Sequence, residues 1–162
     1  MLDSHQIRLA RHEDLLSIER IERESNPEPW TKQALATSLD LPNQCYVLCV
    51  SDTMKAYLVG MTAAEEASLL HIVVEKKSQG QGLATRLILF WLEQLQGLQS
   101  INECWLEVRQ SNFVAQAVYQ KLGFKQISIR KDYYKKSRLV GDATGNATKE
   151  DALIYRLQLS TL

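Results

Sequence analysis

The chain has 162 residues, of which 45% are hydrophobic, 23% charged and 7% aromatic. This length and composition are typical of one globular domain over residues 1–162 and exclude a multidomain protein. Because nineteen Lys and Arg residues balance nineteen Asp and Glu residues, nothing at whole-chain level indicates binding to nucleic acid or to a membrane surface. No apolar run approaches the ~20 residues that span a bilayer, and no signal peptide is evident, so we expect a cytoplasmic protein.

The first part of the chain predicts a strand and two helices. A short alternating strand over 7–9 precedes an apolar-periodic helix over 13–24. Four apolar side chains are expected on the buried side of that helix: Leu15, Leu16, Ile18 and Ile21. Thr31 is placed to cap a second, shorter helix, with Trp30 and Leu35 spaced to form a hydrophobic staple.

Three segments rich in β-branched and aromatic residues follow, over 45–50, 55–62 and 67–75. Only short breaks separate them. A connection this short cannot cross over between parallel strands, so the three segments predict an antiparallel meander.

The second half predicts two helices and three strands. In chain order these are a helix over 83–96, a strand over 103–109, a helix over 113–122, and strands over 124–131 and 152–159, with a long polar loop over 135–149 between the last two. Asn112 is placed to cap the second of these helices and Gly123 to end it. Its buried stripe is expected to consist of Val114, Ala117, Val118 and Leu122.

The three cysteines predict packing rather than chemistry. Cys45, Cys49 and Cys104 are odd in number, lie in apolar runs and lack the spacing of metal ligands. We therefore expect three reduced thiols, no disulfide and no metal site.

The element order β-α-α-β-β-β-α-β-α-β-β indicates an α/β fold with a central mixed, mostly antiparallel sheet flanked by helices. At its middle, a strand leads through a polar segment with Gly80 and Gly82 into a helix. The free backbone N–H groups at such a helix start suit a phosphate-bearing ligand. The segment is neither a P-loop nor a good Rossmann fingerprint. Taken alone, it is explained equally well as a flexible connector.

Several motifs in order carry a family resemblance. Gln79-Gly80-Gln81-Gly82-Leu83-Ala84 resembles the Gln/Arg-x-x-Gly-x-Gly/Ala signature of the Gcn5-related N-acetyltransferase (GNAT) superfamily. Five further segments resemble its RimI branch, the ribosomal-protein-alanine N-acetyltransferases: Pro29-Trp30-Thr31, Trp105-Leu106-Glu107-Val108-Arg109 with Ser111-Asn112, Ala117 to Phe124, Asp132-Tyr133-Tyr134 and Glu150-Asp151-Ala152. The resemblance spans nearly the whole chain and implies the GNAT fold, with acetyl-coenzyme A as co-substrate and no metal.

The resemblance also implies a cofactor site. The glycine loop would bind the pyrophosphate of acetyl-coenzyme A, and backbone groups of the preceding strand would bind its pantetheine arm. The cofactor-binding residues implied are Ile72, Val73, Val74, Gln79, Gly80, Gln81, Gly82, Leu83, Ala84, Thr85 and Asn112. A buried central strand explains the β-branched residues equally well, and simple helix capping explains Asn112.

Amide formation from an amine and a thioester needs a base for the amine and a proton for the departing thiolate. The resemblance assigns the base to Glu107, acting directly or through water, although a surface glutamate paired with Arg109 explains the same residue. The resemblance favours Tyr119 as the acid, and a phenol with a pKa of about 10 stays protonated and can donate to a thiolate. The alternative is that Tyr119 only packs beside the apolar stripe of its helix. His71 is expected to be a structural histidine.

Recognition of the acceptor is expected to involve aromatic side chains and local charge. Trp30, Tyr133 and Tyr134 are the expected substrate-binding residues, with one tyrosine as a groove wall and the other packed. Residues 121–138 hold seven basic side chains and one acidic, whereas residues 13–28 hold six acidic and two basic. This split either orients a basic partner or reflects solvated surfaces.

The resemblance implies acetyl transfer to a protein N-terminal amine, that of the alanine of small-subunit ribosomal protein eighteen. The partner would be the N-terminus of a basic ribosomal protein, with no direct contact to nucleic acid or membrane, and the enzyme a monomer or weak dimer. Two alternatives stay open. One is a GNAT enzyme for a small-molecule amine or a lysine side chain, and the other is a non-enzymatic acyl-coenzyme A binding module.

Overall fold

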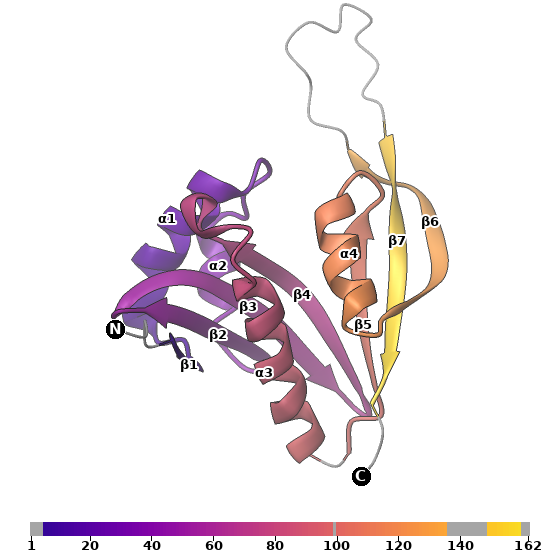
Figure 1. Cartoon of the computed structure of the whole chain (residues 1–162), viewed down its shortest axis with the longest axis horizontal. Coiled ribbons are helices and arrows are strands. Elements are labelled where there is room, and N and C mark those ends of the chain that lie inside the picture. The colour runs from indigo at the N-terminus through magenta and orange to yellow at the C-terminus, as the bar shows by residue number, and fades with distance from the viewer. Residues whose placement is uncertain (1–4, 99, 136–148, 160–162) are drawn as a thin grey trace, which may run out of the picture.

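The computed structural model describes residues 5–98, 100–135 and 149–159, and within them seven strands form one sheet in the order β1-β2-β3-β4-β5-β7-β6 (Figure 1). The strands are β1 (His5–Leu9), β2 (Asn43–Val50), β3 (Thr53–Ala63), β4 (Glu66–Val74), β5 (Glu103–Arg109), β6 (Lys125–Lys135) and β7 (Lys149–Gln158). The helices are α1 (Leu15–Ser25), α2 (Lys32–Thr37), α3 (Leu83–Gly97) and α4 (Phe113–Lys121), with 3-10 turns η1 (His12–Asp14) and η2 (Lys76–Ser78). The predicted element order is confirmed.

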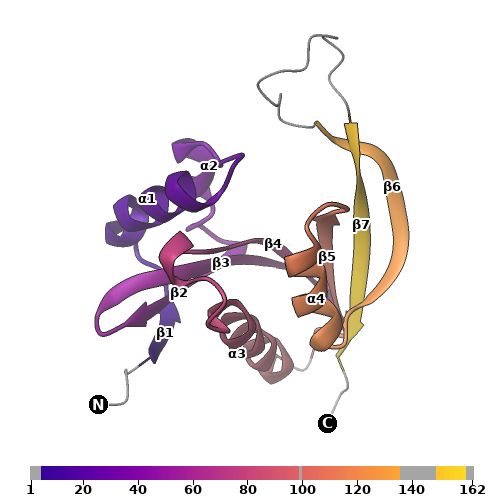
Figure 2. The ribbon, with the colours of Figure 1, turned by 45° about the horizontal axis from the view of Figure 1, so that its top comes forward.

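The sheet is mixed, as expected. Every neighbouring pair of strands is antiparallel except β4 and β5, which run parallel. Their pairing covers only Glu66–Leu69 of β4 and Glu103–Leu106 of β5. Beyond those residues the two strands diverge, and Figures 1 and 2 show the sheet opening between them. This opening is the feature on which the site is built.

Helices cover both faces of the sheet. α1 and α2 lie over one face, and α3 and α4 over the other (Figure 2). Ile18, Ile21 and Leu35 pack with Val47 and Tyr57 beneath α1 and α2. A larger cluster lies under α3 and α4 and includes Trp91, Leu87, Leu106 and Tyr155. The larger core contains residues of β2–β4 as well as of β5 and β7 and so joins the two halves of the sheet, whereas the smaller core holds α1 and α2 on the β1–β4 half.

The buried sides predicted for two helices are confirmed only in part: Ile18 and Ile21 of α1 and Val118 and Leu122 of α4 face a core, but other members do not. Leu16 of α1 is 72% exposed, because it lies on the opposite side of the helix from the buried Ile18. In α4, Val114 and Ala117 are exposed, and the inward stripe is Ala115, Val118, Tyr119 and Leu122, with the i, i+3, i+4, i+7 spacing of one helix face. Tyr119 is therefore part of the packed side of α4, rather than a neighbour of it.

Several boundaries also differ from the prediction. The strand predicted over 124–131 continues to Lys135 as β6, because its register against β7 shifts between Arg130 and Tyr134 and extra residues bulge out. β7 begins at Lys149 and not at residue 152. Most of the loop predicted over 135–149 lies outside the described residues. The predicted bounds of β5, and the caps Thr31 and Asn112, are confirmed.

The three thiols are free, and Cys45, Cys49 and Cys104 are all buried. Burial raises the pKa of the Cys45 and Cys104 thiols to about 12, which keeps both protonated. Across residues 5–98, 100–135 and 149–159, the structure holds no group of three or more side chains placed to bind a metal ion. Nor does any described helix have the length and apolar character needed to cross a bilayer.

Candidate active site

The opening in the sheet exposes one edge of β4. The register between β3 and β4 shifts after Val59, so that Leu70 is an extra residue in β4, a β-bulge. The bulge falls where the pairing with β5 ends at Leu69. From Leu70 onward the edge of β4 that faces β5 lacks a strand partner. The Glu75 N–H donates to β3, so by alternation the backbone of Val73 also faces its β3 partner Tyr57, and the backbone groups of Ile72 and Val74 face the opening.

The side chains of this part of β4 are used for packing. Ile72 and Val74 pack against the core under α3, whereas Val73 is buried in the core under α1 and α2. Ile72 and Val74 therefore have backbone groups that face the opening, whereas both the side chain and the backbone of Val73 are used within the fold.

The glycine loop leads from β4 into α3. Gly80 and Gly82 have φ values of +75° and +76°, which glycine adopts without strain. A Cβ atom built on either glycine would meet no atom within 4 Å. The space over the loop is thus open to a ligand, and φ rather than crowding requires glycine at both positions.

Gly82 is the N-cap of α3, and the first helical bond runs from the Arg86 N–H to the Gly82 carbonyl at 3.1 Å. The N–H groups of Gly82, Leu83, Ala84 and Thr85 consequently have no partner within the helix. The start of a fifteen-residue helix also carries a partial positive charge. The loop thus suits the pyrophosphate of coenzyme A.

Gln79 and Asn112 support this region through local hydrogen bonds. The Gln79 side-chain amide donates to the Val74 carbonyl at 3.1 Å and ties the loop back to β4. Asn112 caps α4 by accepting a hydrogen bond from the Ala115 N–H at 3.1 Å. Asn112 is therefore the N-cap of α4, as predicted. Gln81 is exposed at the loop surface.

Glu107 lies on β5 just beyond the point where β4 leaves it. Its neighbours Leu106 and Val108 point into the core under α3 and α4, so Glu107 points to the other face. Its carboxylate forms an ion pair with Arg130 of β6 at 2.9 Å, and 32% of its side chain is exposed. The alternative prediction, that Glu107 is a surface glutamate paired with Arg109, is wrong about the partner, which is Arg130.

Arg109 instead links three parts of the chain. Its guanidinium forms ion pairs with Glu150 of β7, at 3.3 Å, and with Glu28 of the segment between α1 and α2. It also lies 4.2 Å from the ring centroid of Tyr134. Since Glu28 belongs to the β1–β4 half, Arg109 connects the two halves across the opening.

Tyr133 and Tyr134 lie on the β6 bulge, where Asp132 adopts a φ of +53°. Tyr133 is 48% exposed and its ring lies under the Arg130 guanidinium, at 4.6 Å. Tyr134 is half-buried. Burial raises its phenol pKa, and the nearby Glu107 carboxylate raises it further. Tyr134 is thus partly packed near the candidate base, whereas Tyr133 faces solvent.

Tyr119 projects from α4 into the core under α3 and α4. It is 6% exposed, and its ring contacts those of Phe124 and Tyr155 at centroid distances of 6.0 and 6.5 Å. Burial, with a smaller effect of Tyr134, raises its phenol pKa, so the hydroxyl stays protonated at neutral pH. A protonated phenol can donate to a thiolate.

A buried network fixes Trp30 near the β4 bulge. Trp30 stacks on His71 with ring centroids 4.3 Å apart, and the His71 Nε2 lies 3.0 Å from the Glu22 carboxylate. Glu22 also accepts hydrogen bonds from the Tyr57 hydroxyl, at 2.5 Å, and from the backbone N–H of Trp30, at 2.7 Å. His71 is thus satisfied by a partner, as expected for a structural histidine.

Glu22 is the residue that sequence reasoning missed. It is 1% exposed, and although burial opposes its ionisation, the hydrogen bonds from His71, Tyr57 and Trp30 hold its pKa at about 2. The signal was a carboxylate one turn after Ile18 on the apolar side of α1. Beside the network, a hollow of about 440 Å³ lies between α2 and the β4 bulge, with Trp30 and Leu70 in its wall.

The two charged segments are partly neutralised within the fold. Asp14 pairs with Arg8 at 2.7 Å, and Glu22 is buried, so neither acts on a partner. In the basic segment, Arg130 pairs with Glu107, and Lys131 with Asp151 at 2.7 Å. The part of the basic segment beyond residue 135 lies outside the described residues. The remaining exposed charge is smaller than the sequence predicted.

Comparison with known proteins adds to this geometry. The acetyltransferase (GNAT) family model matches residues 15–124. A ribosomal protein bS18-alanine N-acetyltransferase of Haemophilus ducreyi is 33% identical over 147 residues, 91% of this chain and 95% of that protein. A ribosomal protein bS18-alanine N-acetyltransferase of Escherichia coli is 30% identical over 91% of this chain and 93% of that protein. The crystal structure of the ribosomal-protein-S18-alanine N-acetyltransferase from Escherichia coli matches with a TM-score of 0.87 and 28% identity, covering 98% of this chain and 96% of that one.

Proposed function

Because the chain belongs to the GNAT family of acetyltransferases and is an acetyl-coenzyme A-dependent N-acetyltransferase, we propose that its acceptor is a protein N-terminal amine. The specific acceptor proposed is the N-terminal alanine of small-subunit ribosomal protein bS18, a basic ribosomal partner met in the cytoplasm. The observation that carries this proposal is 33% identity over 91% of the chain to an enzyme named for that reaction. We also assign residues 1–162 to a single N-acetyltransferase domain, supported by one continuous sheet.

The cofactor side of the opening is assigned to backbone groups. The N–H groups of Gly82 to Thr85 would hold the pyrophosphate, with Gln79, Gly80 and Gln81 shaping the loop, and the free edge of β4 at 72–74 would hold the pantetheine arm. Asn112 would contact the cofactor from the start of α4. Bound there, acetyl-coenzyme A supplies the thioester whose acetyl group is transferred.

Glu107 and Tyr119 supply the proton transfers. An N-terminal amine has a pKa near ~7.7–8.0, so much of it is protonated at pH 7 and a carboxylate base of modest strength suffices. Glu107 accepts that proton from the face of β5 opposite α4, directly or through water. Tyr119, on the α4 side, donates a hydrogen bond and a proton to the departing thiolate. Base and acid thus approach the opening from opposite faces of the sheet.

The acceptor would enter on the face that carries Glu107. Trp30, held by His71, and Tyr133 and Tyr134, held by the β6 bulge, stand around that entrance. The hollow beside Trp30 and Leu70 offers space for an apolar side chain of the peptide.

The test is mass spectrometry of peptides incubated with the protein and acetyl-coenzyme A. A peptide with the N-terminal sequence of bS18 should gain one acetyl group on its α-amine, and the same peptide with a blocked N-terminus should gain none. Acetylation only of lysine side chains or of polyamines would contradict the proposed acceptor. Binding of acetyl-coenzyme A without any transfer would instead indicate a binding module.

A further inference from the structure

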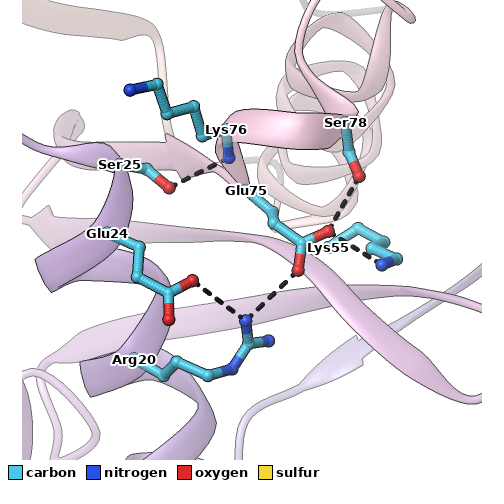
Figure 3. A network of polar contacts seen from close by, with 7 residues as sticks. All are labelled: Arg20, Glu24, Ser25, Lys55, Glu75, Lys76 and Ser78. Carbon is cyan, nitrogen blue, oxygen red and sulfur yellow. Dashed lines mark hydrogen bonds and ion pairs between the residues drawn. The ribbon is translucent and has the colours of Figure 1, made fainter.

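We propose that Glu75 is a positioning residue that holds the loop Gln79–Thr85 in the conformation that presents its N–H groups to the pyrophosphate of acetyl-coenzyme A. Glu75 directly follows β4, ahead of η2 and the glycine loop. Its side chain lies at the centre of a network of polar contacts (Figure 3). The inference rests on the cofactor role proposed above for this loop.

The carboxylate of Glu75 is shared among three elements. It accepts hydrogen bonds from the Lys55 ammonium of β3 at 2.8 Å, the Ser78 hydroxyl of η2 at 2.9 Å and the Arg20 guanidinium of α1 at 3.2 Å. Glu75 is 9% exposed, so these contacts are shielded from water. The Lys55 contact, with those of Ser78 and Arg20, lowers the pKa of this carboxyl to about 2, which keeps it ionised at neutral pH.

Backbone bonds attach the turn to the same residue. The Glu75 N–H donates to the Lys55 carbonyl at 2.7 Å, and the Ser78 N–H donates to the Glu75 carbonyl at 2.8 Å. A second tether runs from the Lys76 N–H to the Ser25 hydroxyl at the end of α1, at 3.0 Å (Figure 3). Glu75 therefore controls where η2 ends and where the loop begins.

Beyond Ser78 the loop has little packing of its own. Open space surrounds the Cα atoms of Gly80 and Gly82 on their Cβ side, and glycine has the largest conformational freedom to lose on ordering. Apart from the hydrogen bond of the Gln79 side chain to the Val74 carbonyl, its conformation depends on its two ends, which are η2, held by Glu75, and α3, anchored by the buried Leu83. A loop that is already held in place loses less conformational entropy when it binds a phosphate.

Electrostatics alone would predict the opposite effect of Glu75. Arg20 and Lys55 are cations at the base of a phosphate site, and the Glu75 carboxylate offsets their charge. If only charge mattered, removal of the carboxylate would raise the attraction for a phosphate. A positioning role predicts weaker binding instead, so the sign of the change in affinity separates the two explanations.

The primary test is calorimetry of coenzyme A with the full chain, which requires no acceptor. Glu75→Gln should raise the Kd about tenfold, the cost of losing one charge-assisted set of hydrogen bonds. The matched control is Glu24→Gln, since Glu24 also pairs with Arg20, at 3.3 Å, but has no contact with η2. It should leave the Kd within about twofold. Unchanged or tighter binding by a folded Glu75→Gln protein would overturn the proposal.

A milder variant covers the case in which Glu75→Gln does not fold. Ser78→Ala removes one hydrogen bond to the carboxylate and keeps its charge, and it should raise the Kd about threefold. A Ser78→Ala protein with the affinity of the parent would then count against the proposal. A melting curve for each protein shows whether Glu75→Gln is folded, and if it is not, the Kd of Ser78→Ala tests the proposal.

A truncated donor separates loop positioning from general structural damage. S-acetylpantetheine lacks the pyrophosphate, so its kcat/KM should be the same for the parent and Glu75→Gln, while that of acetyl-coenzyme A falls about tenfold. An equal loss with both donors would show only a structural role. If no peptide is acetylated, the proposed acceptor is wrong, but calorimetry with coenzyme A still tests the role of Glu75. A parent protein that does not bind coenzyme A would overturn both the cofactor role of the loop and the role of Glu75.

Discussion

At the scale of single residues, the candidate general base Glu107 also takes part in an ion pair. Arg130 of β6 forms an ion pair with its carboxylate at 2.9 Å, so a substrate amine or a water would meet a carboxylate that is already held in place. With 32% of its side chain exposed, Glu107 can still reach water or an amine. Its position on the open face of β5 therefore allows catalysis and a surface ion pair together.

We predict that Glu107→Gln lowers turnover at pH 7 by about 10²–10⁴, because the amide keeps the shape of the side chain but accepts no proton. The loss should shrink as pH rises, since the amine then deprotonates by itself. Thiol release measured from pH 6 to 9 with saturating acetyl-coenzyme A tests this. Arg130→Gln is the control, because it breaks the same ion pair and leaves the base. A comparable loss in that control would assign the effect to the ion pair.

Tyr119 combines a packed ring with a hydroxyl whose burial keeps it protonated. Tyr119→Phe should lower kcat by about 10²-fold, with little change in coenzyme A affinity or melting temperature, because only one oxygen is removed. Tyr155→Phe is the matched control, since this neighbouring buried phenol bonds to Gln120 at 3.2 Å. If Tyr119→Phe stays within a few-fold of the parent, the thiolate takes its proton from solvent.

At the scale of elements, α3 and β3 approach so closely that one glycine is required between them. A Cβ atom on Gly60 of β3 would lie 2.4 Å from the ring of Trp91 in α3. Trp91 is 0% exposed, and its indole N–H donates to Gln44 of β2 at 3.1 Å. The ring thus has no room to shift, and this contact sets how α3, with the glycine loop at its start, sits on the sheet.

Gly60→Ala should therefore destabilise the protein by about 1–3 kcal/mol, the usual cost of overpacking a core. Urea unfolding at constant temperature measures the loss. Gly97→Ala serves as the control, since a Cβ atom there would meet nothing within 4 Å. Equal stability of Gly60→Ala and the parent would mean that α3 can move away from the sheet without cost.

At the scale of the whole molecule, buried carboxylates connect α1 to the sheet. Glu22 joins α1 to Tyr57 of β3 and His71 of β4, and Glu75 joins the end of β4 to Arg20 of α1. Both carboxyl pKa values are held at about 2, below the ordinary glutamate value of 4.5. A depressed folded-state pKa stabilises the protein above pH 4.5, and this stabilisation is lost as pH falls from 4.5 toward 2.

The free energy of unfolding should accordingly fall between pH 5 and pH 3, with a loss of about 2 kcal/mol from Glu22 alone over that range. Glu22→Gln should be less stable than the parent at pH 7 and should lose less stability on acidification. Urea titrations at pH 7, 5 and 3 measure both effects. Part of the pH dependence should persist, since Glu75 is retained. A parallel dependence in the two proteins would show that the fold does not lower the pKa of Glu22.

Local physics determined the elements of this protein from the sequence. The alternation of β5, the caps Thr31 and Asn112, and the glycine loop before an apolar helix all depend on residues a few positions apart. The element order followed from these signals. Helix rotation was less well determined, as Leu16 and Val114 show, because a shift of one residue turns a helix by about 100°.

Long-range pairing decided the rest. The divergence of β4 from β5 after Leu69, the pairing of Glu107 with Arg130 and the link from Glu28 to Arg109 join residues far apart in the chain. A carboxylate on an apolar helix face, such as Glu22, is explained only by the strands that bring Tyr57 and His71 to it. The sequence alone thus determined which groups this protein carries. Only the tertiary structure decided which of them meet, because a contact between distant residues depends on the packing of the whole sheet.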